Sequence, residues 1–227
     1  MATKEPLLLV GGQAINLWAL YYEGVTKDMA PFVSRDVDLL GDRKVLKEIA
    51  ELAGLKPNYF PLKPPSNEVG YVAPEDATGG LVVIEVLRWV NGVSGDELLK
   101  DSVTMGIGQD QVPVRLPSPV YLLKAKLANL ASINQKGRQD GRHVMILFRL
   151  IPSYFKDLIG SVNARARSER SVVYVLGALL EIVTSEENRR ILDMMELEAK
   201  TLFGELPTEG FPKIAAFKKH QLKRVFG

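Results

Sequence analysis

Two aspartates separated by a single apolar residue, Asp36 and Asp38, have the type and spacing that could bind a divalent cation. The segment turns hydrophobic after them, which predicts an extended strand that carries both carboxylates on one face. Mg²⁺ prefers oxygen ligands, and a two-metal site holds its ions about 3.5–4 Å apart. The pair therefore predicts a cation site. The alternative is a pair of solvated strand-edge carboxylates, because Asp-x-Asp alone is common.

A glycine pair, Gly11 and Gly12, lies between the short apolar run 7–10 and a predicted helix over 13–22. Glycines before a helix allow a ligand to approach the backbone closely, and the free N–H groups there favour a phosphate. An ordinary glycine turn is the alternative, because no complete dinucleotide or Walker pattern follows.

A third carboxylate, Glu85, interrupts the most strand-like segment of the chain. Residues 81–87 are otherwise apolar and mostly β-branched, which predicts a central strand buried on both faces. A carboxylate in such a place requires a cation or a proton nearby. The alternative is a strand-edge glutamate that faces water.

The remaining patterns predict the elements that would position these acids. A helix is expected over 41–54, a loop or edge strand over the proline-rich 56–74, a short helical turn at 96–99 in a polar stretch, and an edge strand at 112–116 because of Pro113. Ser118-Pro119 then begins a series of helices, with later ones near 138, at 171–183 and at 186–203. The fold class is thus α/β (α+β): a small mixed sheet core at residues 1–117 and an all-helical part at 118–227.

Composition excludes several kinds of catalysis. The chain of 227 residues has no cysteine and two histidines, His143 and His220, which removes thiolate chemistry and cysteine-ligated metals and leaves little for a Ser-His-Asp triad. No apolar run approaches the roughly 18 residues of a membrane span, and the N-terminus lacks the pattern of a secretory signal. We therefore expect a soluble, cytoplasmic protein without a membrane partner.

Charge is balanced over most of the chain, with a formal net value of +2, but the C-terminal end is basic and amphipathic. Such an end can lie along RNA phosphates, and a helix with a solvated face is the alternative. Its cations are Lys213, Lys218, Lys219, His220, Lys223 and Arg224.

These motifs together resemble the DNA polymerase beta-type nucleotidyltransferase superfamily. The resemblance rests on Gly11-Gly12-Gln13-Ala14 opening a helix, Ser34-Arg35-Asp36-Val37-Asp38-Leu39, and Glu85 in a later strand. The Gly-Gly-x-Ala form and the Ser-Arg-x-x-Asp spelling resemble the bacterial branch that includes abortive-infection nucleotidyltransferase toxins. A lysine in the first following helix matches Lys126, whereas Gln139-Asp140 stands where that branch has Lys-Asp.

The resemblance implies transfer of a nucleoside monophosphate from a nucleoside triphosphate to an acceptor hydroxyl, with Mg²⁺ or Mn²⁺ as cofactor. Asp36, Asp38 and Glu85 would be the catalytic and metal-binding residues. The nucleotide-binding residues would be Gly11, Gly12, Ser34, Arg35 and Lys126, with Lys124 as a further cation or, like Lys126, part of a solvated helix face. The acceptor class stays open between RNA or tRNA, protein and a small molecule. A homodimer or a cognate antitoxin is a possible partner, and the alternative function is a non-catalytic binding or regulatory module, such as a toxin-antitoxin component.

Overall fold

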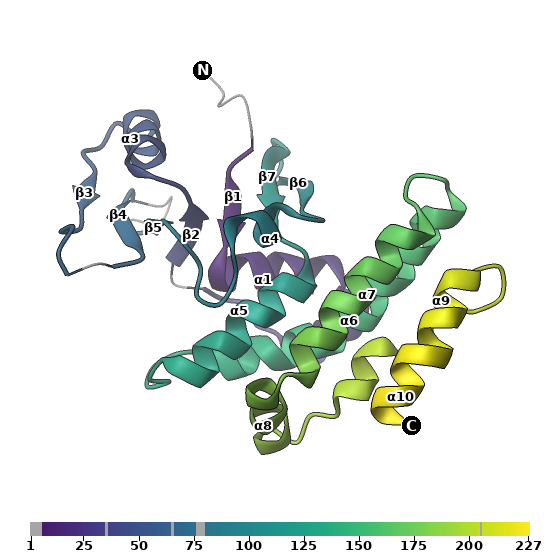
Figure 1. The fold of residues 1–227 in the computed structure, drawn as a ribbon. Helices are drawn as coiled ribbons and strands as arrows, with labels where there is room; N and C mark the ends of the chain where they lie inside the picture. Colours follow the sequence, from purple (N-terminus) through teal and green to yellow (C-terminus); the bar gives the residue numbers. More distant parts are fainter. Residues whose placement is uncertain (1–5, 35, 65, 76–79, 205) are drawn as a thin grey trace. The chain divides into compact units, whose positions relative to one another are not determined.

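A seven-stranded mixed sheet and a series of helices make up the computed structural model, which describes residues 6–34, 36–64, 66–75, 80–204 and 206–227 (Figure 1). The strand order is β3-β4-β5-β2-β1-β7-β6. The strands are β1 (Leu8–Val10), β2 (Asp36–Leu40), β3 (Asn58–Tyr59), β4 (Glu68–Val72), β5 (Val83–Leu87), β6 (Val103–Ile107) and β7 (Val112–Leu116).

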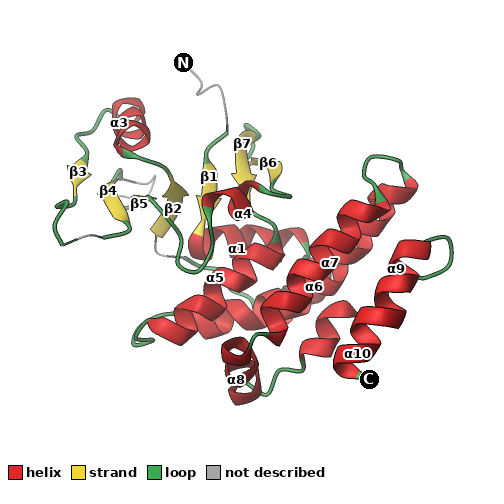
Figure 2. Cartoon of the chain, viewed as in Figure 1, coloured by secondary structure: helices red, strands yellow, loops and turns green. Residues whose placement is uncertain are grey.

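The predicted fold class is confirmed. Strands β1 to β7 form one mixed sheet, and every described element after β7 is helical (Figure 2). Strand β2 is antiparallel to β1 and parallel to β5, so it lies at the centre of the sheet. The short strands do not alternate strictly with helices, as a doubly wound sheet would require.

Local signals explain where the helices of the front half begin and end. These helices are α1 (Gly11–Tyr21), α3 (Arg43–Leu52) and α4 (Gly95–Leu99). The Asp42 side chain caps α3 by accepting from two backbone N–H groups, and Ser94 and Glu97 form a capping box on α4. Gly54 ends α3 in the left-handed region with the two backbone bonds of a Schellman motif.

Three strand predictions were wrong. The proline-rich region contains β4, an interior strand between β3 and β5, because Glu68–Val72 itself holds no proline. The glycine-rich stretch before residue 108 contains β6, and β6 rather than β7 is the edge. Pro113 is tolerated in β7 because β1 pairs with that strand only at Leu8 and Arg115, away from the proline.

The prediction that β5 is buried on both faces was also wrong. Of its five residues only Val86 is fully buried, and the other four are half-buried. The face that carries Glu85 is therefore partly open to water, although β5 is an interior strand of the sheet.

Helices form the second half of the chain: α5 (Pro119–Ser132), α6 (Asp140–Asn163), α7 (Glu169–Thr184), α8 (Glu186–Met194), α9 (Pro212–Phe217) and α10 (Lys223–Phe226). Two shorter turns, η2 (Ala199–Phe203) and η3 (Lys218–Leu222), lie among them. The helix expected over 186–203 ends at Met194, because Glu196 takes a left-handed conformation with φ 56°.

Two compact units divide the chain. The sheet unit holds the residues up to Tyr21 together with Met29–Ala125, and the helical unit holds Tyr22–Asp28 and Lys126–Gly227. The predicted boundary at 117/118 differs from this division, which falls inside α5. The short α2 (Glu23–Thr26) belongs to the helical unit, where the neighbouring Tyr22 hydroxyl donates to Asp157 over 2.9 Å.

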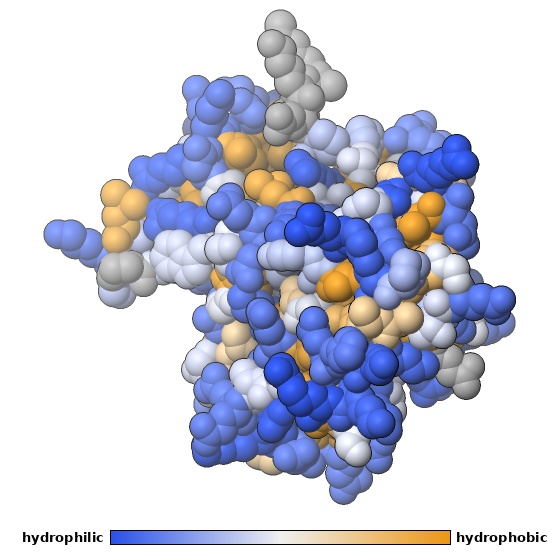
Figure 3. Space-filling view, turned by 45° about the vertical axis from the view of Figure 1, so that its right-hand side comes forward, coloured by the Kyte–Doolittle hydropathy of each residue, from blue (hydrophilic) through white to orange (hydrophobic). Residues whose placement is uncertain are grey.

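Surface polarity is uneven on the face of the molecule drawn in Figure 3. Figure 3 shows one side of the molecule, on which hydrophilic residues dominate and hydrophobic residues form separate patches. No helix in the described part of the chain is long and apolar enough to span a bilayer.

Candidate functional site

The sheet places the three predicted acids on one face. Asp36 and Asp38 are two residues apart on β2, so their side chains point to the same side. In the parallel register, Asp38 lies directly beside Glu85 of β5, and Asp36 lies beside Val83. Two neighbouring aspartates and a glutamate 47 residues later in the chain thus share one patch of the sheet, and the shared face of Asp36 and Asp38 agrees with the strand pattern.

A hydrophobic cluster anchors this patch. Leu40 and Leu87 follow Asp38 and Glu85 by two residues and therefore lie on the same face. Both pack against a buried cluster that includes Val10 of β1 and Tyr121 of α5. The cluster fixes one end of β2 and β5, so the acids are held in register immediately beside the core.

The electrostatics of the patch are unfavourable for three full negative charges. Burial and then the charges of Asp38, Asp36 and Glu68 raise the pKa of Glu85 from 4.5 to about 7. Glu68, on β4, is an acid that the sequence analysis missed. The unbroken run Glu68–Val72 between prolines was the signal for its strand, but its closeness to Glu85 depends on strand pairing.

Gly11 lies against this patch at the start of α1. It has φ +65°, and a Cβ added to it would overlap the carboxylate of Asp38. Both the backbone conformation and the contact therefore require glycine. Gly12 is the next residue of α1 and is buried. The predicted phosphate contacts of both glycines stay predictions.

Replacing Gly11 by alanine is expected to destabilise the protein by about 1–3 kcal/mol more than replacing Gly54 by alanine. Both glycines have nearly the same positive φ, +65° and +66°, but nothing lies within 4 Å of a Cβ at Gly54. Gly54→Ala therefore measures the conformational penalty alone. Urea unfolding of the two variants makes the comparison, and equal losses would show that Asp38 does not press on Gly11.

The patch suits a hard cation in its chemistry but is not a preformed cage. Its donors are carboxylate oxygens, which Mg²⁺ prefers, and three carboxylates, those of Asp36, Asp38 and Glu85, share one face of the sheet. Among the described residues, no three His, Asp or Glu side chains converge closely enough to hold a metal ion. Two carboxylates with phosphate oxygens from a ligand would fit the usual Mg²⁺ site.

Of the two predicted nucleotide-binding residues just before β2, the structure describes Ser34. The Ser34 hydroxyl donates to the backbone carbonyl of Asp36 over 3.0 Å, so it supports the start of β2. Arg35 lies outside the described residues. The nucleotide contacts of Ser34 and Arg35 remain predictions.

Lys126, the predicted triphosphate cation, lies in the helical unit and is 7% exposed. Its Nζ is 2.7 Å from Oδ1 of Asp140, at the first turn of α6, so the alternative of a solvated helix face was wrong for this lysine. Arg138 and Asn129 also donate to that carboxylate. Lys124 instead pairs with Glu97 over 2.6 Å at a half-buried position of the sheet unit.

Buried charge shifts two pKa values around this ion pair. For Asp140, burial opposes ionisation, but hydrogen bonds from Arg138 and Lys126 and the charge of Lys126 lower its pKa to about 2. For His143, burial and then the charge of Lys126 lower the pKa to about 4, partly opposed by Asp140. His143 is thus a neutral, buried side chain at neutral pH.

The buried His143 is expected to contribute a loss of stability on acidification. Unfolded His143 binds a proton near pH 6.5 and folded His143 only near pH 4, so the unfolded state binds more protons in that window. The contribution of His143 to stability therefore falls by about 3 kcal/mol as the pH falls from 6.5 to 4, and it is opposed by Glu85, whose raised pKa favours the folded state as that carboxyl takes up its proton. Asp140 adds a further loss below pH 4.

Urea unfolding of the wild type and of His143→Gln across this pH range tests the assignment. The variant is expected to lose the fall in stability that His143 contributes between pH 6.5 and 4, because its side chain does not titrate, so its stability relative to the wild type rises as the pH falls. His220→Gln, at an exposed position, is the matched control. An unchanged pH slope in His143→Gln would contradict the assignment.

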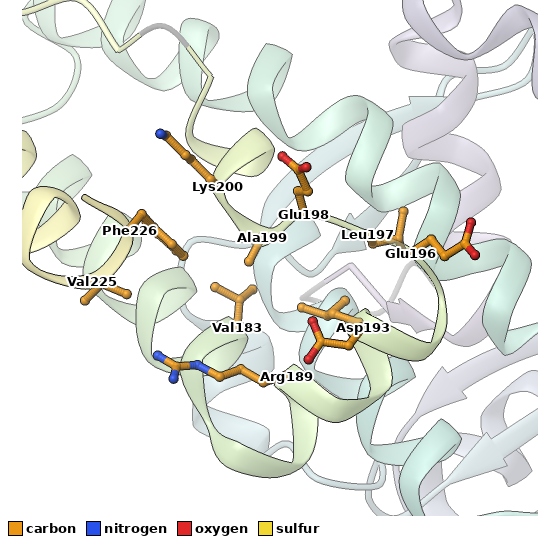
Figure 4. A pocket seen from close by; sticks show the side chains of 11 residues that line it. Val183, Arg189, Asp193, Glu196, Leu197, Glu198, Ala199, Lys200, Val225 and Phe226 are labelled. Carbon is orange, nitrogen blue, oxygen red and sulfur yellow. The ribbon is translucent and has the colours of Figure 1, made fainter.

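The helical unit also contains a cavity of about 620 Å³ between α7, α8, η2 and α10 (Figure 4). Apolar side chains such as Val183 and Phe226 lie beside charged ones of both signs, including Arg189 and Asp193. The mixed lining does not indicate one class of ligand. Sequence analysis could not find this cavity, because its walls come from four separate elements.

Comparison with known proteins leaves the chain without an assigned family. No family model matches it, and no curated protein matches it. One solved structure with similarity is an antigenic nucleotidyltransferase-like protein from Paracoccidioides brasiliensis, with 16% identity, a TM-score of 0.42, and coverage of 86% of this chain and 84% of that one. Similarity at this level does not assign a family or an activity.

Proposed function

We propose that this chain is a metal-dependent nucleotidyltransferase that moves a nucleoside monophosphate from a nucleoside triphosphate to an acceptor hydroxyl. The observation that carries the proposal is the alignment of Asp36, Asp38 and Glu85 on one face, with the glycine-led α1 against Asp38. The motifs that resemble the DNA polymerase beta-type superfamily, including its abortive-infection branch, agree with it.

The acids would divide the work between binding and proton transfer. Asp36 and Asp38 would hold the cation together with the triphosphate, and the backbone of Gly11 and Gly12 would face the phosphates. Mg²⁺ or Mn²⁺, when bound, supplies positive charge to the phosphate oxygens. Glu85, directly beside Asp38 in the parallel register, would act as the general base for the acceptor hydroxyl.

The bond changes in this reaction balance without a redox partner. The acceptor oxygen forms a bond to the α-phosphorus, the bond from that phosphorus to the pyrophosphate oxygen breaks, and Glu85 takes the proton of the acceptor hydroxyl. Such transfers depend mainly on positioning and charge neutralisation. The acceptor can be RNA, protein or a small molecule, and a homodimer or a cognate antitoxin is a proposed partner.

Isothermal titration with a nucleoside triphosphate and Mg²⁺ tests the binding step. The wild type is expected to bind, and the Asp36→Ala/Asp38→Ala variant is expected not to bind. Glu48→Gln/Glu51→Gln removes one half-buried and one exposed carboxylate of α3 and is the matched control. Unchanged binding in the double aspartate variant would remove the metal assignment.

A second candidate function is a non-catalytic binding or regulatory module, such as a toxin-antitoxin component. The observation that favours it is that no three acidic or histidine side chains in the described regions converge on one metal position. Mass spectrometry of RNA, protein and small hydroxyl compounds incubated with each triphosphate separates the two. A mass gain of one nucleoside monophosphate supports the enzyme, and its absence from every acceptor supports the module.

A further inference from the structure

The C-terminal helical segment concentrates positive charge. This basic helix, residues 212–226, comprises α9, η3 and α10, which Figure 1 draws in yellow. It contains five Lys or Arg residues and one histidine, but no Asp or Glu. Those five cations exceed the net charge of +2 of the whole chain, so the rest of the chain is net negative. All six basic side chains are exposed.

The opposite face of the basic helix is held by packing. Ile214 and Phe217 are buried, and the ring of Phe203 contacts both Phe217 and Phe226, with centroids 6.4 and 5.8 Å apart. The carboxylate of Glu169 accepts two backbone N–H bonds from the start of α9. The cations are therefore displayed on a helix whose orientation within the helical unit is fixed.

A π turn gathers the cations further. Over η3 the backbone N–H of Lys223 donates to the carbonyl of Lys218, which is an i→i+5 bond. In an α-helix these residues would lie about 140° apart around the axis, and a π turn brings i and i+5 closer together. Lys218 therefore approaches Lys223, and Lys219 approaches Arg224. Adjacent like charges destabilise a helix unless a ligand neutralises them.

The buried apolar face of the basic helix favours a nucleic acid over a lipid bilayer as the partner. An amphipathic basic helix binds a bilayer by inserting its apolar face between the lipids. In this protein the apolar face of the basic helix packs against the helical unit, so the side chains left exposed for a partner are mainly the charged ones. A nucleic acid presents a row of phosphates to such a surface. Each Lys or Arg that contacts a phosphate releases counterions from the nucleic acid, and this release favours binding.

We propose that the basic helix binds the phosphate backbone of a nucleic acid. Lys218, Lys219, Lys223 and Arg224 provide the central contacts, and binding is independent of base sequence because contacts to phosphate carry no base information. The proposal does not depend on nucleotidyl transfer, since it concerns residues outside the acidic patch.

Fluorescence anisotropy with a labelled single-stranded RNA of mixed sequence, measured over a series of salt concentrations, tests this surface. The wild type is expected to bind with a log–log salt slope that Lys218→Gln/Lys219→Gln reduces in magnitude by about 1.4, because two phosphate contacts are lost. Lys44→Gln/Lys47→Gln removes the same charge from two exposed lysines of α3 that pair with glutamates. This control is expected to leave the slope unchanged.

Thermal unfolding followed by circular dichroism verifies that each variant is folded before its binding is compared. Three outcomes would overturn the proposal: no RNA binding by the wild type at low salt, an equal change of slope in both variants, or binding only to phosphatidylserine vesicles. Loss of binding confined to the Lys218/Lys219 variant, with Asp36→Ala/Asp38→Ala still binding RNA, would support it independently of catalysis.

Discussion

Replacing Asp38 by asparagine is expected to reduce nucleotidyl transfer about 10³-fold or more, because losing a cation ligand removes several kcal/mol of charge stabilisation. The same change is expected to stabilise the protein without metal. Asp38 lies beside Glu85. After burial, its negative charge has the largest effect in raising the pKa of Glu85. Removing it relieves like-charge repulsion worth about 1 kcal/mol after solvent screening.

Opposite effects on activity and stability distinguish a functional acid from a structural one. Pyrophosphate release measures the first effect, and urea unfolding in a chelator measures the second. Glu51→Gln is the control, since it removes a carboxylate that is 64% exposed and pairs only within α3. Its effect on stability is expected to stay within about 0.5 kcal/mol. A destabilised Asp38→Asn would mean that Asp38 serves the fold.

The sequence could predict the shared face of Asp36 and Asp38 because this part of the pattern is local. Alternation along β2 places Asp36 and Asp38 on one face whichever strands pair with it. The contact between Asp38 and Glu85 required a register between strands 47 residues apart, which the chain pattern does not specify. Glu68 was missed because the prolines around β4 predicted a loop or an edge strand, whereas β4 is an interior strand beside β5.

Lys126 shows why a helical stripe can mislead. The apolar positions of α5 predicted that this lysine lies outside the buried stripe, but residues 119–123 and 125–127 are all buried. The compensating acid, Asp140, begins the next helix and could not be identified as its partner from spacing alone. A helix buried on most sides loses the periodic signal on which such predictions depend.

Replacing Asp140 by leucine is expected to destabilise the protein by about 3–5 kcal/mol, because it leaves the Lys126 ammonium buried without its carboxylate. Lys126→Met is expected to be similarly harmful, since Asp140 is 1% exposed. The double variant Lys126→Met/Asp140→Leu removes both charges and is expected to recover most of the loss. Urea unfolding of the four proteins forms a double-mutant cycle.

The partly exposed pair Lys124–Glu97 is the matched control, with side chains 31% and 33% exposed. Breaking it by Lys124→Met is expected to change stability by no more than about 1 kcal/mol. An Asp140→Leu protein as stable as the wild type would contradict a structural role for the buried pair. The double variant also tests the predicted nucleotide contact of Lys126: if it folds normally but binds the triphosphate with Mg²⁺ more weakly, the lysine serves the ligand as well as the fold.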